Sequence, residues 1–155
     1  MLSCNKFQLI TIDYQYLSKL YSACNQVFYK PQNYNKPYLG VLINHGGREY
    51  AIPLTSAKNK HKSFKNYQDG QLLIYENLPL NSTIDQNKNI CIVEQSGIKH
   101  ILAVLVIKKM IPIKKGHYSI CNFRINQNDS PTEKKYKNLL NKEFKFLRIR
   151  KGENY

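Results

Sequence analysis

The feature that most constrains this fold is a pair of apolar segments joined by a glycine turn. YLGVLIN (38–44) leads into His45-Gly46-Gly47, and REYAIPLTS (48–56) follows it. β-Branched and aromatic residues on both sides of a short glycine-containing turn predict a β-hairpin. Pro53 has no N–H to donate to a neighbouring strand, so the second strand is expected to lie at an edge or to end soon after it.

A second hairpin is expected further along the chain. CIVEQ (91–95) and KHILAVLVI (99–107) flank a turn at Ser96-Gly97. The run ILAVLVI (101–107) is apolar throughout, which is typical of a central strand buried on both faces. Further strands are expected at 7–12 and 72–76, and shorter strands or connectors at 110–113 and 118–123.

Two helices complete the expected set of elements. Asp13 can cap a helix over residues 14–25. Ser130-Pro131-Thr132-Glu133 is a capping box with proline at the first helical position. Helical spacing gives the first helix an apolar face of Leu17, Leu20, Tyr21 and Cys24. It gives the second an apolar face of Tyr136, Leu139, Leu140, Phe144 and Leu147. The segments 26–37, 57–70 and 76–89 are expected to be loops.

This order of elements predicts an α+β fold, with antiparallel hairpins, an N-terminal helix and a long C-terminal helix. The 155 residues fit a single domain, which we expect to span residues 1–155. Hydrophobic residues make up 42% of the chain, which is enough for a folded core rather than a disordered segment.

The charge of the chain favours a polyanionic partner. Lysine and arginine number 24 against 10 acidic residues, which gives a formal net charge of +14. Such an excess of cations repels itself in a compact protein and attracts nucleic acid more commonly than membrane. No apolar run approaches the roughly 20 residues that span a bilayer. The N-terminus also lacks the apolar region of a signal peptide, so we expect no membrane association and a cytoplasmic location.

The cysteines do not indicate a metal site. Cys4, Cys24, Cys91 and Cys121 are far apart in the sequence, and no histidine lies at ligand spacing from a pair of them. Reduced thiols that are buried or have no special role are the better interpretation. We therefore expect neither a metal nor a cofactor.

The stretch IPLTSAKNKHKSFKN (52–66) places hydroxyls and cations together at the end of a strand. Thr55, Ser56 and Lys58 are spaced so that a loop leaving the strand could wrap around one phosphate. The following lysines could then track neighbouring phosphates; they are Lys60, Lys62 and Lys65. The residues alone leave open a plain alternative, in which Thr-Ser begins a turn and the lysines form a solvated loop.

The chemistry that this cluster would suit is cleavage of an RNA backbone without metal. The ribose 2′-hydroxyl attacks its own phosphate, and the protein must align it, move protons and stabilise the added negative charge. His61 is a candidate general acid because its ordinary pKa lies near neutrality, although a surface histidine is an open alternative. Lys36 precedes the first hairpin strand, and antiparallel pairing brings that end of the hairpin close to Thr55 and Ser56.

Several segments resemble the toxin endoribonucleases of type III toxin–antitoxin systems, the ToxN/AbiQ family. The segment 35–61 matches a lysine before an apolar strand followed by the pattern P-L-T-S-x-K-x-x-H. The matching positions are Lys36, Tyr50, Pro53, Leu54, Thr55, Ser56, Lys58 and His61. VIKKMIPI (106–113) and YKNLLNKEFKFLR (136–148) resemble two further segments of the family, in the same order along the chain.

The resemblance implies a strongly twisted antiparallel sheet related to the SH3-like barrel of Kid/MazF toxins. It also implies a metal-independent endoribonuclease that cuts mRNA and its own repetitive antitoxin RNA, leaving 2′,3′-cyclic phosphate and 5′-hydroxyl ends. A pseudoknot of that antitoxin RNA would inhibit the toxin within a cyclic toxin–RNA assembly. The implied catalytic residues are Lys36, Thr55, Ser56 and Lys58, with Tyr34 as a further match, and His61 stays the candidate general acid. Additional RNA contacts are expected from Arg48, Lys114 and Lys115.

Two other functions fit the sequence. A non-catalytic basic RNA-binding module would have the same charge and the same abundance of tyrosine, with 12 in the chain. A Kid/MazF-type ribonuclease neutralised by a protein antitoxin would share the fold. Growth arrest on expression separates the first from a toxin, and the DNA upstream of the coding sequence separates an RNA antitoxin from a protein one.

Overall fold

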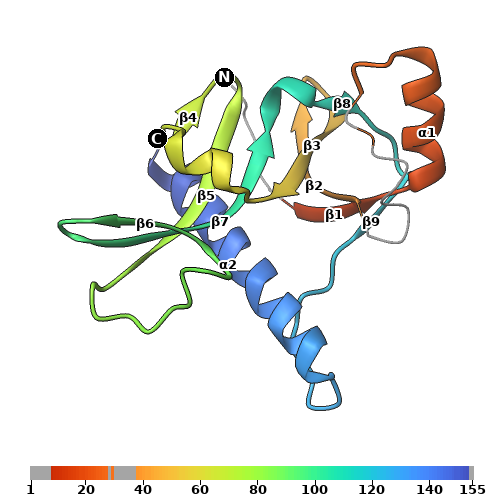
Figure 1. Ribbon diagram of the computed structural model, residues 1–155. Helices are drawn as coiled ribbons and strands as arrows, with labels where there is room; N and C mark the ends of the chain where they lie inside the picture. Colours follow the sequence, from red (N-terminus) through yellow and green to blue (C-terminus); the bar gives the residue numbers. More distant parts are fainter. Residues whose placement is uncertain (1–7, 28, 30–37, 154–155) are drawn as a thin grey trace. The chain divides into compact units, whose positions relative to one another are not determined.

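The computed structural model describes residues 8–27, 29 and 38–153. Its elements are labelled in Figure 1. In chain order they are β1 (Gln8–Ile12), α1 (Tyr14–Ala23), β2 (Tyr38–His45), β3 (Arg48–Ser56), the 3-10 helix η2 (Asn59–Ser63), β4 (Tyr67–Gln68), β5 (Gln71–Leu78), β6 (Ile90–Glu94), β7 (Gly97–Val106), the 3-10 helix η3 (Ile107–Lys109), β8 (Ile111–Pro112), β9 (Tyr118–Ile120) and α2 (Pro131–Glu153).

The chain forms two compact units. The first comprises Met1–Thr55 and Leu105–Cys121, and the second comprises Ser56–Val104 and Asn122–Tyr155. Each unit has its own cluster of buried apolar side chains. That the chain is a single domain stays a prediction.

The first unit is built on the predicted hairpin of β2 and β3. Its strands lie in the order β3-β2-β1-β9, and β8 pairs with the other side of β3; every pairing is antiparallel. The hairpin turn is shorter than the sequence suggested, because His45 pairs with Arg48 and only Gly46 and Gly47 remain unpaired. Both glycines have positive φ, which is the conformation that a two-residue hairpin turn requires. One cluster of buried apolar side chains in this unit consists of Ile10, Ile12, Leu17, Leu42, Ala51, Ile111 and Ile113.

Helix α1 begins where the sequence predicted, but its buried face is different. The Asp13 carboxylate accepts a hydrogen bond from the Gln15 N–H at 3.2 Å, as expected of a cap. Leu17 is buried. Tyr21 and Cys24, which we placed on the same face, are exposed. The helix ends at Ala23, so Cys24 lies beyond its last turn, and Tyr16 packs on the core instead.

The second unit holds the second predicted hairpin. Its strands lie in the order β4-β5-β7, and β6 pairs with β7 from Ile90↔Ile101 to Glu94↔Gly97. The turn is therefore Gln95-Ser96, one residue earlier than predicted. Residues 101–106 of β7 are all buried, which confirms the prediction for this apolar run, while Ile107 belongs to η3.

The segment 57–70, predicted to be a loop, contains η2 and the short strand β4. Strand β4 forms a hairpin with β5 through Asp69 and Gly70, which both have positive φ. Asp-Gly is the strongest short-range signal of such a turn. The turn at Asp69-Gly70 is therefore visible in the sequence, but the run of lysines before it led to the prediction of a loop.

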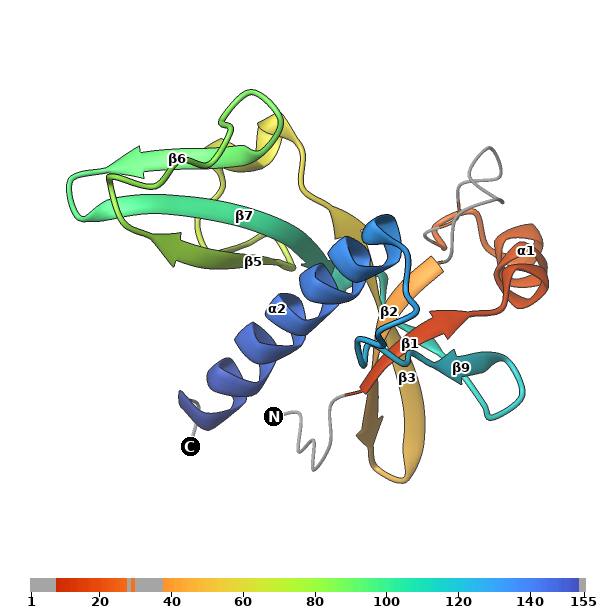
Figure 2. The same ribbon diagram turned by 90° about the horizontal axis from the view of Figure 1, so that it is seen from below.

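Helix α2 packs against β5, as Figure 2 shows from below. The Ser130 hydroxyl accepts a hydrogen bond from the Glu133 N–H at 3.1 Å, which confirms the predicted N-terminal cap. Phe146 packs against Tyr75 of β5, with ring centroids 5.0 Å apart. Among residues 131–148 of the helix, the buried side chains are Leu140, Glu143 and Leu147. The first and third are predicted core residues, and the second is not.

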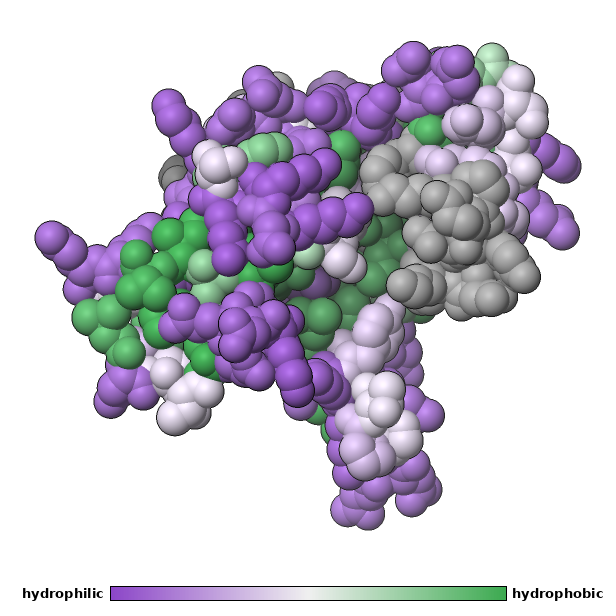
Figure 3. All heavy atoms as spheres, viewed as in Figure 1, coloured by the Kyte–Doolittle hydropathy of each residue, from purple (hydrophilic) through white to green (hydrophobic). Residues whose placement is uncertain are grey.

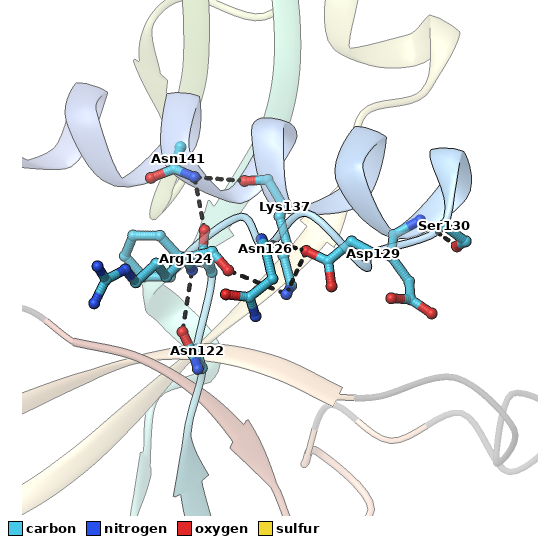
Figure 4. Close-up of polar contacts among 9 residues, drawn as sticks. Asn122, Arg124, Asn126, Asp129, Ser130, Lys137 and Asn141 are labelled. Atoms are coloured by element: carbon cyan, nitrogen blue, oxygen red, sulfur yellow. Dashed lines mark hydrogen bonds and ion pairs between the residues drawn. The ribbon is translucent and has the colours of Figure 1, made fainter.

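The segment that leads into α2 is held against the helix by side-chain contacts (Figure 4). The Lys137 ammonium lies 2.8 Å from the Asp129 carboxylate and donates to the Arg124 carbonyl at 3.1 Å. The Asn141 amide donates to the Phe123 carbonyl at 2.9 Å. These bonds order a polar stretch that has little apolar burial of its own.

No helix in the described ranges is both long and apolar enough to cross a membrane. Within the same ranges, no three histidine, cysteine, aspartate or glutamate side chains come together in a way that could hold a metal ion.

Candidate functional site

Thr55 and Ser56, the two hydroxyl residues predicted for the site, are the last two residues of strand β3. Thr55 is half-buried and Ser56 is exposed, and the three residues before them are buried. This change follows from the sequence, because the apolar Ile-Pro-Leu run ends at Leu54 and polar residues take over. The hydroxyl groups thus lie at the point where a rigid core strand becomes a turn.

The backbone of Lys58 is fixed by His61 at two places. The Lys58 N–H donates to the His61 Nδ1 at 2.8 Å. The Lys58 carbonyl accepts from the His61 N–H at 2.9 Å. The two bonds close the turn that opens η2, and the lysine at its start is therefore held in one backbone conformation.

The same turn is anchored on the core of the second unit. Ala57, just before it, and Phe64, just after it, pack against the cluster of Leu73, Ile101 and Val104. The Phe64 ring also meets the His61 ring edge-on, at 5.2 Å between centroids. The segment is thus a tightly held turn and not the freely solvated loop that the sequence left open as an alternative.

His61 is not a surface histidine. Its side chain is only 3% exposed, although the residues around it in sequence are lysines with exposed side chains. Burial lowers the pKa of His61 below the ordinary value of 6.5, and the nearby cations Lys60 and Lys58 lower it further. The ring is therefore neutral at physiological pH, with the Nδ1 as an acceptor. A general-acid role for His61 stays a prediction that this environment does not favour.

The lysines around this turn are all exposed; they are Lys58, Lys60, Lys62 and Lys65. No carboxylate in the described part of the chain forms a salt bridge with any of them. Figure 3, drawn in the view of Figure 1, shows hydrophilic side chains gathered over η2. Uncompensated ammonium groups on a fixed backbone are suited to binding phosphates.

Lys36 and Tyr34 lie outside the described residues. The hairpin register nevertheless helps to place Lys36. Gly40 pairs with Pro53, and continuing this antiparallel pairing by two residues puts Tyr38 opposite Thr55. Lys36 precedes Tyr38 by two residues in the chain. Its place near Thr55 stays a prediction that rests on this register.

The other expected RNA contacts are not gathered at the same place. Arg48 is exposed at the turn end of β3, seven residues from Thr55, which is about 23 Å along an extended strand. Lys114 and Lys115 are exposed in the turn before β9, where the Lys114 carbonyl accepts from the His117 N–H at 3.2 Å. Arg48 therefore cannot serve the phosphate that Thr55 would bind.

One polar cluster was not predicted. Glu76 of β5 lies 2.8 Å from the Nδ1 of His100 on β7 and 3.2 Å from the ammonium of Lys142 on α2. Hydrogen bonds from His100 and Lys142 outweigh burial and lower the pKa of Glu76. No sequence spacing links these residues, because the pairing of β5 with β7 and the docking of α2 bring them together.

The chain is similar to known proteins over most of its length. The model of the family described as toxin ToxN of type III toxin–antitoxin systems matches residues 8–154. The chain belongs to this family. Endoribonuclease ToxN of Bacillus thuringiensis subsp. kurstaki is 29% identical to it over 122 residues, which are 72% of this chain and 62% of that protein. The chain thus spans less than two thirds of the length of this ToxN relative.

Two solved structures share the fold of the chain described here. One comes from work on a processed non-coding RNA that regulates a bacterial antiviral system, with a TM-score of 0.64, 23% identity, and coverage of 94% of this chain and 78% of that one. The other comes from work on selective toxin inhibition by a non-coding RNA pseudoknot in bacterial type III systems. It has a TM-score of 0.58, 22% identity, and coverage of 94% and 71%. They confirm the predicted α+β fold class.

Proposed function

We propose that this chain is a metal-independent endoribonuclease that acts as the toxin of a type III toxin–antitoxin system. The observation that carries the proposal is the end of strand β3, where the Thr55 and Ser56 hydroxyls come just before a lysine whose backbone is fixed. Membership of the ToxN family and the name of the Bacillus relative support it. The net charge of +14 supports a nucleic acid as substrate.

In the proposed reaction the ribose 2′-oxygen attacks the adjacent phosphorus and the bond to the 5′-oxygen breaks. The 2′-hydroxyl proton passes to the neutral amine form of Lys58 or Lys36, the other lysine keeps its ammonium charge, and the 5′-oxygen takes up a proton from water as it leaves. The products are a 2′,3′-cyclic phosphate and a 5′-hydroxyl. Ser56, Thr55 and the lysine ammonium groups stabilise the extra negative charge on the phosphate oxygens as it develops.

The proposed inhibitor is an RNA. Both structural neighbours come from work on non-coding RNA, and one of them concerns inhibition by a pseudoknot. We propose that a repetitive antitoxin RNA is cut by the toxin and then held by it in a cyclic assembly. Cellular mRNA would be the substrate when that RNA is lost, so the activity belongs in the cytoplasm.

The experiment uses purified protein, a random-sequence RNA pool and excess EDTA. We expect cleavage with cyclic-phosphate and 5′-hydroxyl ends, and we expect Ser56→Ala to lower the rate by about a hundredfold, the loss typical of removing one donor to a developing charge. Ser63→Ala is the matched control, because Ser63 is exposed in the same segment and its hydroxyl donates only to the Lys60 carbonyl.

Three results would reject the proposal. They are a requirement for Mg²⁺, 3′-hydroxyl product ends, and full activity of Ser56→Ala. A non-catalytic RNA-binding module would bind the pool without shortening it and would not arrest growth when expressed alone.

A further inference from the structure

The contacts of His61 indicate how the backbone at Lys58 is held in place. This inference goes beyond the proposed function and also rests on it. His61 is buried within a lysine-rich segment, which is an unfavourable place for a basic side chain. A phenylalanine or leucine would fill the same space at lower cost. The Lys58 N–H donates to its Nδ1 at 2.8 Å, which is a polar contact that an apolar side chain could not make.

The direction of this hydrogen bond fixes the protonation of the ring. A backbone N–H is always the donor, so Nδ1 must be unprotonated and must act as the acceptor. The single proton of a neutral ring then lies on Nε2. A doubly protonated ring would turn Nδ1 into a donor facing another donor, and the bond would be lost.

We propose that His61 is a positioning residue, which holds the Lys58 backbone through an unprotonated Nδ1 and so sets the point from which the Lys58 side chain reaches the phosphate. Ala57 and Phe64 attach the two ends of the turn to the core, but neither touches the backbone polar groups of Lys58 through a side chain. His61 is what closes the turn between them. In this role the ring transfers no proton to RNA.

The charged and titratable groups near the ring agree with a neutral histidine. Lys58 and Lys60 act on it from its own segment, and both disfavour a second proton. Strand β6, which packs against η2, contributes Cys91, a thiol whose pKa is raised by burial; Lys62 and Glu76 also act on this thiol, but neither shifts the pKa of His61. None of these groups supplies the negative charge that would favour an imidazolium.

A comparison of two amide substitutions at His61 tests the proposal. In His61→Asn the side-chain oxygen occupies the place of Nδ1, whereas in His61→Gln it reaches the place of Nε2. Both remove the ring and its contact with Phe64, so the two variants have the same polar group and differ by one methylene. On the random-sequence RNA pool, we expect Asn to retain about ten times more kcat than Gln, the difference expected for one intact hydrogen bond, with little change in KM.

The same pair separates positioning from proton donation. A general acid at this place could be replaced by neither amide, so equal loss of kcat in both variants would overturn the proposal. His61→Phe, which keeps an aromatic ring and removes the acceptor, is expected to behave like His61→Gln. Wild-type activity in that variant, or a change in KM alone, would also overturn it.

A measurement without RNA makes the outcome independent of catalysis. In the full chain labelled with ¹⁵N, we expect the NMR shifts of His61 to show an unprotonated Nδ1 and a protonated Nε2. The Lys58 amide should exchange with solvent about ten times faster in His61→Phe than in the wild type. A protonated Nδ1 would overturn the inference, while wild-type protein that has these shifts and leaves RNA intact would reject only the proposed function.

Discussion

At the scale of single residues, the structure buries two ionisable groups, one with a hydrogen-bond partner and one with an oxygen that lacks one. His61 is buried with its acceptor satisfied. Glu143 of α2 is equally buried, at 3% exposure, but its Oε2 has no hydrogen-bond partner among the described residues. Burial raises the pKa of Glu143 from 4.5 to about 8. This carboxyl is therefore protonated in the folded protein at neutral pH, and its ionisation opposes folding.

The pH dependence of stability follows from the sign of this shift. The folded state holds the Glu143 proton more tightly than the unfolded state does. The contribution is fully present below about pH 4.5 and is lost as the pH rises through about 8. It amounts to roughly 5 kcal/mol. We predict that Glu143→Gln, which keeps the shape and cannot ionise, removes most of this loss of stability.

The measurement is urea unfolding at several pH values between 5 and 9. Glu94→Gln is the matched control, because Glu94 is exposed on β6 and its replacement should leave the pH dependence unchanged. Equal pH profiles for wild type and Glu143→Gln would show that the carboxyl is not buried in the folded protein.

At the scale of elements, the hairpin of β6 and β7 depends on one glycine. Gly97 pairs with Glu94 at the turn and has a φ of +154°. A Cβ built on it would lie 2.5 Å from the carbonyl oxygen of Leu78, the last residue of β5. Backbone atoms cannot move aside as a flexible side chain would, so any side chain here must shift a strand.

We predict that Gly97→Ala lowers the free energy of unfolding by about 3 kcal/mol, through overpacking together with backbone strain. Gly46→Ala is the control. Gly46 also has positive φ, at +60°, but no described atom lies within 4 Å of its Cβ position. That variant should lose only about 1 kcal/mol, the cost of the left-handed conformation alone. Equal losses in the two variants would show that the contact with Leu78 does not matter.

At the scale of the whole molecule, the dominant property is charge. The excess of cations is 14, and the four lysines around η2 are exposed without a paired carboxylate in the described chain. Because each neutralised phosphate releases a counterion, RNA affinity should fall steeply with salt.

We predict that Lys60→Gln reduces the slope of log affinity against log salt concentration by about 0.7, the value for one contact to a single strand. Lys88→Gln removes the same charge from an exposed position outside the η2 segment and should leave the slope unchanged. Filter binding of the random-sequence RNA pool over a range of NaCl concentrations measures both. A flat salt dependence for the wild type would contradict a phosphate-binding surface at η2.

The sequence by itself determined the elements and the chemical groups. Local patterns set the hairpin of β2 and β3, the buried run of β7 and the capped helix α2, because turns, alternation and caps depend on neighbours in the chain. The motif around Thr55 and Ser56 was visible for the same reason. The tertiary structure alone decided which of these groups are buried. His61 and Glu143 sit in polar sequence, and only the packing of η2 and α2 on other elements removes them from water. Burial, and with it protonation, depends on residues far away in the chain, and no local pattern contains that information.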